Sequence, residues 1–138
     1  MAYYSLVEGV RGYCLYAPSL SAAFQPTHWK EALRLATEMS HLAPVLAAGK
    51  PGADASLNVD SASGSVYFRE IQSGRDHVLI AVNMSGGAVV AKWTFKRPTQ
   101  PVVLFEDRQA MRSSLEMQDV FAPYQVHVYQ WGVPKAGG

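Results

Sequence analysis

Short apolar segments alternate with turns over residues 56–131 of this 138-residue chain. The turns are rich in Ser and Gly and lie at residues 61–64, 73–76 and 85–87. Each apolar segment has the length of a β-strand. The predicted strands are residues 65–72, 77–84, 88–95, 101–106 and 124–131. Many strands with short links predict an antiparallel β-sandwich, because tight turns can join only antiparallel neighbours.

Two of these segments also predict which strand faces are buried. Residues 77–84 are apolar on both alternating sets of positions, which indicates a central strand covered on both sides. In residues 88–95, Ala91, Trp93 and Phe95 alternate with more polar neighbours. That alternation is typical of a half-buried strand, whose successive side chains point to opposite faces.

Residues 1–48 have a different pattern. Tyr4 to Glu8 are predicted to end a helix, with Gly9 as the residue that terminates it. Val10 to Ala17 are apolar almost without interruption and include β-branched and aromatic residues. Such a run predicts a strand buried on both faces, as in a parallel sheet.

A long amphipathic α-helix is predicted from Thr27 to Leu46, with Thr27 as its N-cap. Its predicted apolar face contains residues spaced by three and four: Trp29, Ala32, Leu33, Ala36, Met39 and Ala43, widened by Leu35 and Leu42. The segment 49–52, Gly-Lys-Pro-Gly, then breaks the chain. We therefore predict a mainly β fold, with an antiparallel β-sandwich domain over residues 49–138. A strand and a long amphipathic helix precede it, within residues 1–48.

Composition excludes several classes of protein. Hydrophobic residues make up 49% of the chain and charged residues 17%, which fits a globular protein. The net charge is +1 and the basic residues are scattered, so we expect no nucleic-acid partner. No apolar run approaches 18 residues, so no membrane partner is expected. The single cysteine, Cys14, lies in an apolar stretch and is expected to be inert.

The order of elements resembles the end of many (β/α)₈-barrel glycoside hydrolases. The matching pieces are residues 9–13 before a loop, residues 29–39, the run His41-Leu42-Ala43-Pro44-Val45-Leu46, and residues 78–83, 102–106 and 121–129 of the predicted sandwich. The resemblance implies that Val10 to Ala17 correspond to the last barrel strand and Thr27 to Leu46 to the last barrel helix. The sandwich would then be the C-terminal domain of such an enzyme.

The chain departs from that family by what it lacks. A (β/α)₈ barrel needs eight strands and about 250 residues. The paired carboxylates of a glycoside hydrolase would lie, by resemblance, on earlier strands that this sequence does not contain. The resemblance therefore implies no catalytic residue and no hydrolytic activity in this chain.

The acidic, histidine and asparagine side chains that could form a functional site are each interpreted as having a structural role. Glu106 and Asp107 follow a predicted strand and are interpreted as a solvated turn. His127 is predicted to be a surface or hydrogen-bonded edge residue, and no His or Cys spacing indicates a metal site or a cofactor. Asn83 begins a glycosylation sequon, but in a hairpin turn Asn also has a backbone role.

Aromatic side chains are the candidates for carbohydrate binding. Tyr16 lies near the carboxyl end of the predicted barrel strand, where barrel active sites are built. Tyr129 and Trp131 could form a sugar-stacking patch together with Trp93, although burial in the sandwich is the default for Trp93. Two hypotheses follow. One is a non-catalytic C-terminal region that braces an absent barrel and forms a homodimer through the exposed N-terminal strand and helix. The other is a free-standing carbohydrate-binding module that uses surface aromatics.

Overall fold

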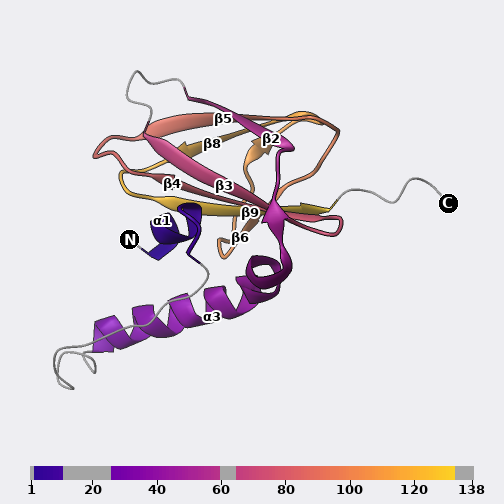
Figure 1. The fold of residues 1–138 in the computed structure, drawn as a ribbon. Helices are drawn as coiled ribbons and strands as arrows, with labels where there is room; N and C mark the ends of the chain where they lie inside the picture. Colours follow the sequence, from indigo (N-terminus) through magenta and orange to yellow (C-terminus); the bar gives the residue numbers. More distant parts are fainter. Residues whose placement is uncertain (1, 11–25, 60–64, 133–138) are drawn as a thin grey trace.

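A computed structural model describes residues 2–10, 26–59 and 65–132, and they form a β-sandwich with helices on one side (Figure 1). One sheet, sheet A, has the order β1-β3-β4-β9-β6. Its strands are β1 (Lys50–Pro51), β3 (Val66–Ser73), β4 (Asp76–Asn83), β9 (Val126–Gly132) and β6 (Val102–Leu104). The other, sheet B, has the order β2-β5-β8-β7. Its strands are β2 (Ala55–Val59), β5 (Val89–Phe95), β8 (Glu116–Phe121) and β7 (Met111–Arg112).

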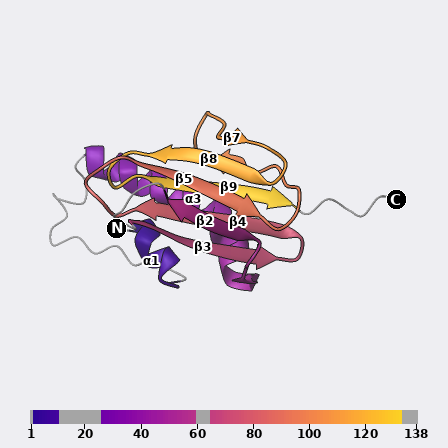
Figure 2. The same ribbon diagram turned by 90° about the horizontal axis from the view of Figure 1, so that it is seen from above.

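Every strand pair is antiparallel, so the predicted antiparallel β-sandwich is confirmed. Figure 2 shows the same layers from above, with α1 and α3 seen beyond the strands. The turn between β3 and β4 places Gly74 at a φ of +62°, a conformation that Gly adopts without steric cost. The strand β4 is buried from His77 to Asn83, as expected of a central strand covered on both sides.

The main hydrophobic core lies between the two sheets. Its members are alternate residues of β4, β5, β8 and β9, because successive side chains of a strand point to opposite faces. Its largest members with no exposed surface are Trp93, Tyr129 and Phe121, all 0% exposed. The predicted alternation of β5 is confirmed, since Ala91, Trp93 and Phe95 are buried while Lys92 and Thr94 are exposed.

A second apolar cluster covers the outer face of sheet A. The short helix α1 (Ala2–Val7) contributes Tyr3 and Leu6, and the long helix α3 (Pro26–Ala48) contributes Leu42 and Leu46. They pack against the outward-facing residues of β3, β4 and β9, which are Ile71, Val78, Ile80, Val82 and Val128. Gly9, two residues after the last residue of α1, has a φ of +103°, as expected of a glycine that terminates a helix.

The structure corrects two predictions about α3. The helix begins at Pro26, so Thr27 lies inside its first turn and is not the N-cap. Pro suits the start of a helix, because the N–H that it lacks would have no partner there. The buried face also overlaps the predicted one only in part, through Leu35, Met39 and Leu42. It is formed by Leu35, Glu38, Met39, Leu42 and Leu46, whereas four members of the predicted apolar face, Trp29, Leu33, Ala36 and Ala43, are exposed.

Two glycines let the chain pass from α3 into the sandwich. A Cβ at Gly49 would lie 2.3 Å from the side chain of Ile71, and a Cβ at Gly52 would lie 2.3 Å from the Glu70 carboxylate. The predicted break at residues 49–52 is thus confirmed, and its cause is close packing against β3. The division into domains 1–48 and 49–138 stays a prediction. Of the predicted strand Val10–Ala17, residues 11–17 lie outside the described part of the chain, and Val10 itself is not in a strand.

Candidate functional site

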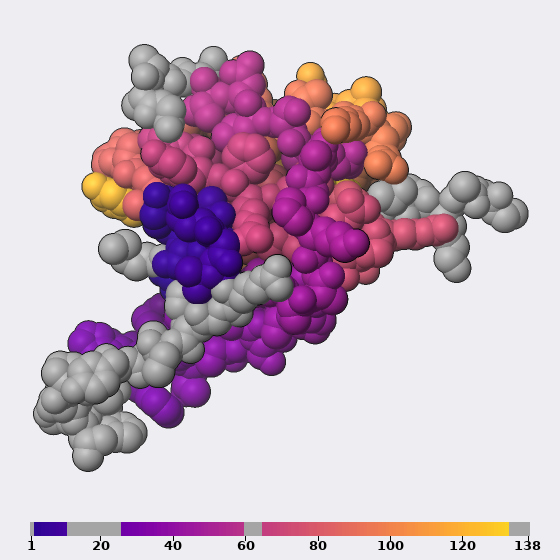
Figure 3. Space-filling view, viewed as in Figure 1, coloured from indigo at the N-terminus to yellow at the C-terminus, as the bar shows by residue number. Residues whose placement is uncertain are grey.

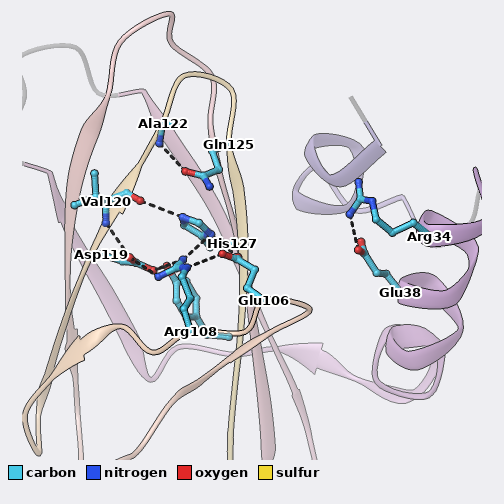
Figure 4. A network of polar contacts seen from close by, with 10 residues as sticks. Arg34, Glu38, Glu106, Arg108, Asp119, Val120, Ala122, Gln125 and His127 are labelled. Carbon is cyan, nitrogen blue, oxygen red and sulfur yellow. Dashed lines mark hydrogen bonds and ion pairs between the residues drawn. The ribbon is translucent and has the colours of Figure 1, made fainter. Parts of the chain in front are cut away.

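Arg108 joins several polar side chains at one end of the sandwich. Its Nη1 and Nη2 donate to the two carboxylate oxygens of Asp119 on β8, at 2.8 and 2.9 Å. Its Nε donates to Glu106 at 2.6 Å, just after β6. His127 on β9 completes the group, with Nδ1 2.6 Å from Glu106 and 2.8 Å from Arg108 (Figure 4). We call Glu106, Arg108, Asp119 and His127 the arginine network.

Burial and pairing set the proton positions in the arginine network. Hydrogen bonds from Arg108 to Asp119 raise the pKa of the guanidinium further above its already high value. Tyr129 donates its hydroxyl to Asp119 at 2.7 Å, and burial together with the Asp119 charge raises the pKa of the phenol well above 10. His127 Nε2 lies 3.1 Å from the Val120 carbonyl, which can only accept, so that nitrogen carries a proton.

These contacts correct two interpretations made from the sequence. His127 is hydrogen-bonded, as predicted, but it is 1% exposed and lies on β9 between β4 and β6, so it is neither a surface residue nor an edge residue. Glu106 is not part of a solvated turn, because Arg108 and His127 bind its carboxylate. The carboxylates of Glu106 and Asp119 are both bound by the same guanidinium, so neither is arranged as a general acid.

A cleft of about 390 Å³ separates the arginine network from α3. On the α3 side, Glu38 is 5% exposed and accepts hydrogen bonds from the Tyr3 hydroxyl and from Arg34. Hydrogen bonding to Glu31 is the main reason that the pKa of Arg34 is raised. On the sandwich side the cleft is lined by Leu104, Phe105, Glu106, Tyr124, Gln125, Val126 and Val128. Figure 4 shows the Arg34–Glu38 pair facing the arginine network from the helix. We call this space the α3 cleft.

Two aromatic residues of the α3 cleft have an uncommon backbone conformation. Phe105 has a φ of +65° and Tyr124 a φ of +57°, and these are the positive-φ residues other than glycine in the described chain. Both side chains are exposed, Phe105 at 41% and Tyr124 at 67%. Positive φ is uncommon for bulky residues, and such conformations concentrate at functional sites. The α3 cleft is therefore the best candidate for a binding site.

Comparison with known proteins gives a likeness of fold. No family model matches the sequence, and no curated protein matches it significantly. A structure of AmyP in complex with maltose aligns with 89% of this chain at 17% identity and a TM-score of 0.64. A structure of a substituted AmyP in complex with maltotriose aligns with 83% of the chain at 16% identity and a TM-score of 0.62.

The fold resembles part of AmyP. The chain spans about a quarter of that protein, since the alignments cover 24% and 23% of the AmyP chains. At these identities the likeness concerns the fold alone. That this chain is one part of a larger protein stays a prediction.

Two of the sequence-predicted carbohydrate-binding residues, Tyr129 and Trp131, lie in the core and do not line the α3 cleft. Tyr129 is 0% exposed and Trp131 is 3% exposed, and both rings pack in the core with Trp93. Stacking on a sugar needs an exposed ring face, so the prediction of an exposed patch at these positions is contradicted by their burial. The expected burial of Trp93 is confirmed. Tyr16 lies outside the described residues.

Asn83 has the backbone role that its turn predicted. It is 0% exposed, and its Oδ1 accepts hydrogen bonds from the backbone N and the hydroxyl of Ser85. Its Nδ2 donates to the carbonyls of Gly87 and Ala122, so the amide is fully used in joining two turns.

Among the described residues no group of His, Cys, Asp and Glu could hold a metal ion. No described helix has the length and apolar character that crossing a bilayer requires.

Sequence reasoning missed a second buried polar group beneath β1. Glu70 is 4% exposed, and its carboxylate accepts hydrogen bonds from the backbone N of Asp54 and Ala55 at 2.8 Å. His77 Nδ1 lies 2.7 Å from the other oxygen, and the His77 ring stacks on Trp131 at 5.1 Å. The bonds to Asp54 and Ala55 hold the loop between β1 and β2, and the contact with His77 joins β3 to β4. Because Glu70 and His77 are both buried, this group explains the local fold and offers no open site.

Proposed function

We propose that this chain is the non-catalytic C-terminal region of a glycoside hydrolase. In this proposal the β-sandwich and α3 brace a catalytic (β/α)₈ barrel that the chain does not contain. The sequence resemblance to such enzymes supports the proposal. The fold likeness to part of AmyP, at a quarter of its length, is consistent with it.

The observation that carries the proposal is a second apolar face on α3. One face of the helix packs on sheet A through Leu42 and Leu46. On another face Trp29 is 49% exposed and Leu33 is 51% exposed, and Ala36 and Ala43 continue the same row. Figure 3 shows α3 lying along the outside of the sandwich. A helix that is apolar on two sides is typical of one buried inside a larger molecule.

The proposed occupant of this second face is the missing barrel. The resemblance assigns α3 to the last barrel helix, which would then have the barrel on one side and the sandwich on the other. In the isolated chain the face stays exposed, and an exposed apolar row promotes association between copies. We therefore propose a homodimer for the isolated chain, formed through α3 and the N-terminal segment.

A carbohydrate is the proposed substrate class of the parent enzyme. Glycoside hydrolases act on sugars by definition of the family, and the AmyP structures hold maltose and maltotriose. The proposal assigns no hydrolysis to this chain, because the two carboxylates that the reaction needs would belong to the barrel.

Sedimentation velocity over a concentration series tests the proposal. We expect the wild-type chain to dimerise and Leu33→Ser to weaken the dimer by roughly 30-fold. Burying the exposed half of a Leu contributes about 1 kcal/mol, and a symmetric dimer contains two copies. Val120→Ser is the matched control, because Val120 is 56% exposed on β8, in the sheet that α3 does not cover. A wild-type chain that stays monomeric, or a dimer that Leu33→Ser leaves intact, would contradict the proposal.

A further inference from the structure

Tyr124 occupies a turn position that normally selects a different residue. The backbone N of Gln125 donates to the Ala122 carbonyl at 3.1 Å, which closes a four-residue turn with Pro123 second and Tyr124 third. Pro in the second position and a φ of +57° in the third form the type II pattern, whose third position favours Gly or Asn. The turn that connects β8 of sheet B to β9 of sheet A would therefore form with less backbone strain if a smaller residue stood at this position. A tyrosine at this position, 67% exposed, indicates a role for its ring.

The ring of Tyr124 borders the α3 cleft beside a second exposed ring. Phe105 also has a positive φ, and its ring packs edge-on against His41 of α3 at 5.5 Å. Gln125 also lines the cleft, with its Oε1 fixed by a hydrogen bond from the Ala122 backbone N at 2.7 Å. The cleft volume of about 390 Å³ lies within the range of small-ligand sites.

The hydrogen-bond partners of the carboxylates indicate what kind of ligand suits the α3 cleft. Aromatic rings beside carboxylates can bind a cation, but each carboxylate here already has a guanidinium partner. Glu38 is paired with Arg34, and Glu106 with Arg108. Arg34 also binds Glu31 and Arg108 also binds Asp119, so each carboxylate is held by hydrogen bonds to a guanidinium that it shares. The remaining polar positions of the cleft can donate to and accept from hydroxyl groups. A neutral ligand with many hydroxyl groups and a flat apolar face fits those properties.

We propose that the α3 cleft binds a neutral oligosaccharide, with Tyr124 as the stacking platform. This inference rests on the proposed function, which makes a sugar the ligand class. The Tyr124 ring contacts the face of one sugar unit, and Arg34, Gln125 and the partly exposed Glu106 carboxylate bind its hydroxyls. The site is distinct from the buried Tyr129 and Trp131, and it joins residues of α3 to residues of the β8–β9 turn.

NMR titration of the full chain with maltotriose and with cellotriose tests this inference. We expect saturable shifts of the backbone amides of residues 105, 106 and 124–126 with at least one of the two sugars. Tyr124→Gly should weaken that binding more than 10-fold while the fold is kept, because Gly is favoured at positive φ. Tyr124→Asn provides a second variant that this turn accepts. Tyr67→Ala is the matched control, because it removes a ring that is 45% exposed on β3, and it should change binding less than 2-fold.

The outcomes separate this inference from the proposed function. No saturable binding of either sugar, binding that survives Tyr124→Gly, or binding of choline in place of sugar would overturn the cleft assignment. Leu33→Ser changes the second face of α3 and not the cleft, so its effect on association reports on the barrel proposal alone. Affinity for the sugar should also change less than 2-fold between low and high NaCl, because a neutral ligand forms no screened ion pair.

Discussion

Arg108→Met is expected to destabilise the sandwich by about 2–3 kcal/mol. Breaking a buried ion pair by removing one partner costs about 3–5 kcal/mol, because the remaining charge is left without compensation. Here the Asp119 side chain is 8% exposed and would lose its bidentate partner. The Arg108 and Glu106 side chains are 32% and 25% exposed, so water reduces the cost toward the lower figure. Tyr129 and the Val120 backbone N would still donate to Asp119.

Urea unfolding followed by tryptophan fluorescence measures this change, because Trp93 and Trp131 are buried in the same core. With a slope of about 1–3 kcal/mol per molar urea, the midpoint should fall by about 1–2 M. Arg75→Met is the control, because Arg75 is exposed in the β3–β4 turn and its loss should cost less than about 0.5 kcal/mol. A double-mutant cycle with Asp119→Asn should give a coupling of about 2 kcal/mol. Additive effects, or a loss no larger than that of Arg75→Met, would refute the reasoning.

Two further predictions concern buried polar groups. Tyr129→Phe should cost about 1–2 kcal/mol at pH 7, because Asp119 loses a donor. The folded-state pKa of Tyr129 is raised above that of the unfolded chain. The stabilisation that the protonated Tyr129 contributes is therefore fully present below pH 10. It decreases as the pH rises above 10, because the phenol then ionises in the unfolded chain and stays protonated in the folded one. The gap between wild type and Tyr129→Phe should therefore narrow by about 0.8 kcal/mol at pH 10.5, and urea unfolding that shows a constant gap would disprove the assignment. Gly52→Ala should cost about 1–3 kcal/mol, because its Cβ would lie 2.3 Å from Glu70. Thermal unfolding of both variants measures this. Gly87→Ala is the control, because nothing lies within 4 Å of the added Cβ, and it should leave the stability nearly unchanged. Equal losses of stability in the two variants would count against the packing argument.

The sequence predicted strands well where apolar periodicity and turns agreed. The strands β3, β4, β5, β6 and β9 all lie within predicted segments or one residue from them. Among the strands that the sequence did not predict, β8 shows why periodicity fails. Its inward-facing residues are Met117, Asp119 and Phe121, and the buried carboxylate of Asp119 interrupts the apolar alternation. Partners that only the fold brings close, Arg108 and the Tyr129 hydroxyl, make that position compatible with a core.

The face of α3 could not be predicted from periodicity for a related reason. The helix has apolar residues on two sides, and a hydrophobic pattern does not reveal which side meets the sandwich. Glu38 lies on the buried side, and its carboxylate is satisfied by Tyr3, 35 positions earlier in the chain, and by Arg34. Because Glu38 is charged, its position was predicted to lie outside the apolar face, whereas it lies within the buried face.

The α3 cleft could not be predicted from the sequence either. Its residues come from α1, α3, the segment after β6 and the β8–β9 turn, and only the fold brings them together. One local signal was present: Pro123 is followed by Tyr124 in the turn between β8 and β9, at a position that prefers Gly. The positive φ of Tyr124 shows why that signal matters.

The DNA upstream of the Met1 codon tests the central claim most directly. If α3 is the last helix of a barrel, the reading frame should continue upstream through about 250 residues with alternating strand and helix patterns and a pair of carboxylates at strand ends. An in-frame stop codon directly before a ribosome-binding signal at Met1 would contradict the account, because the exposed row of Trp29 and Leu33 would then have no barrel to cover it.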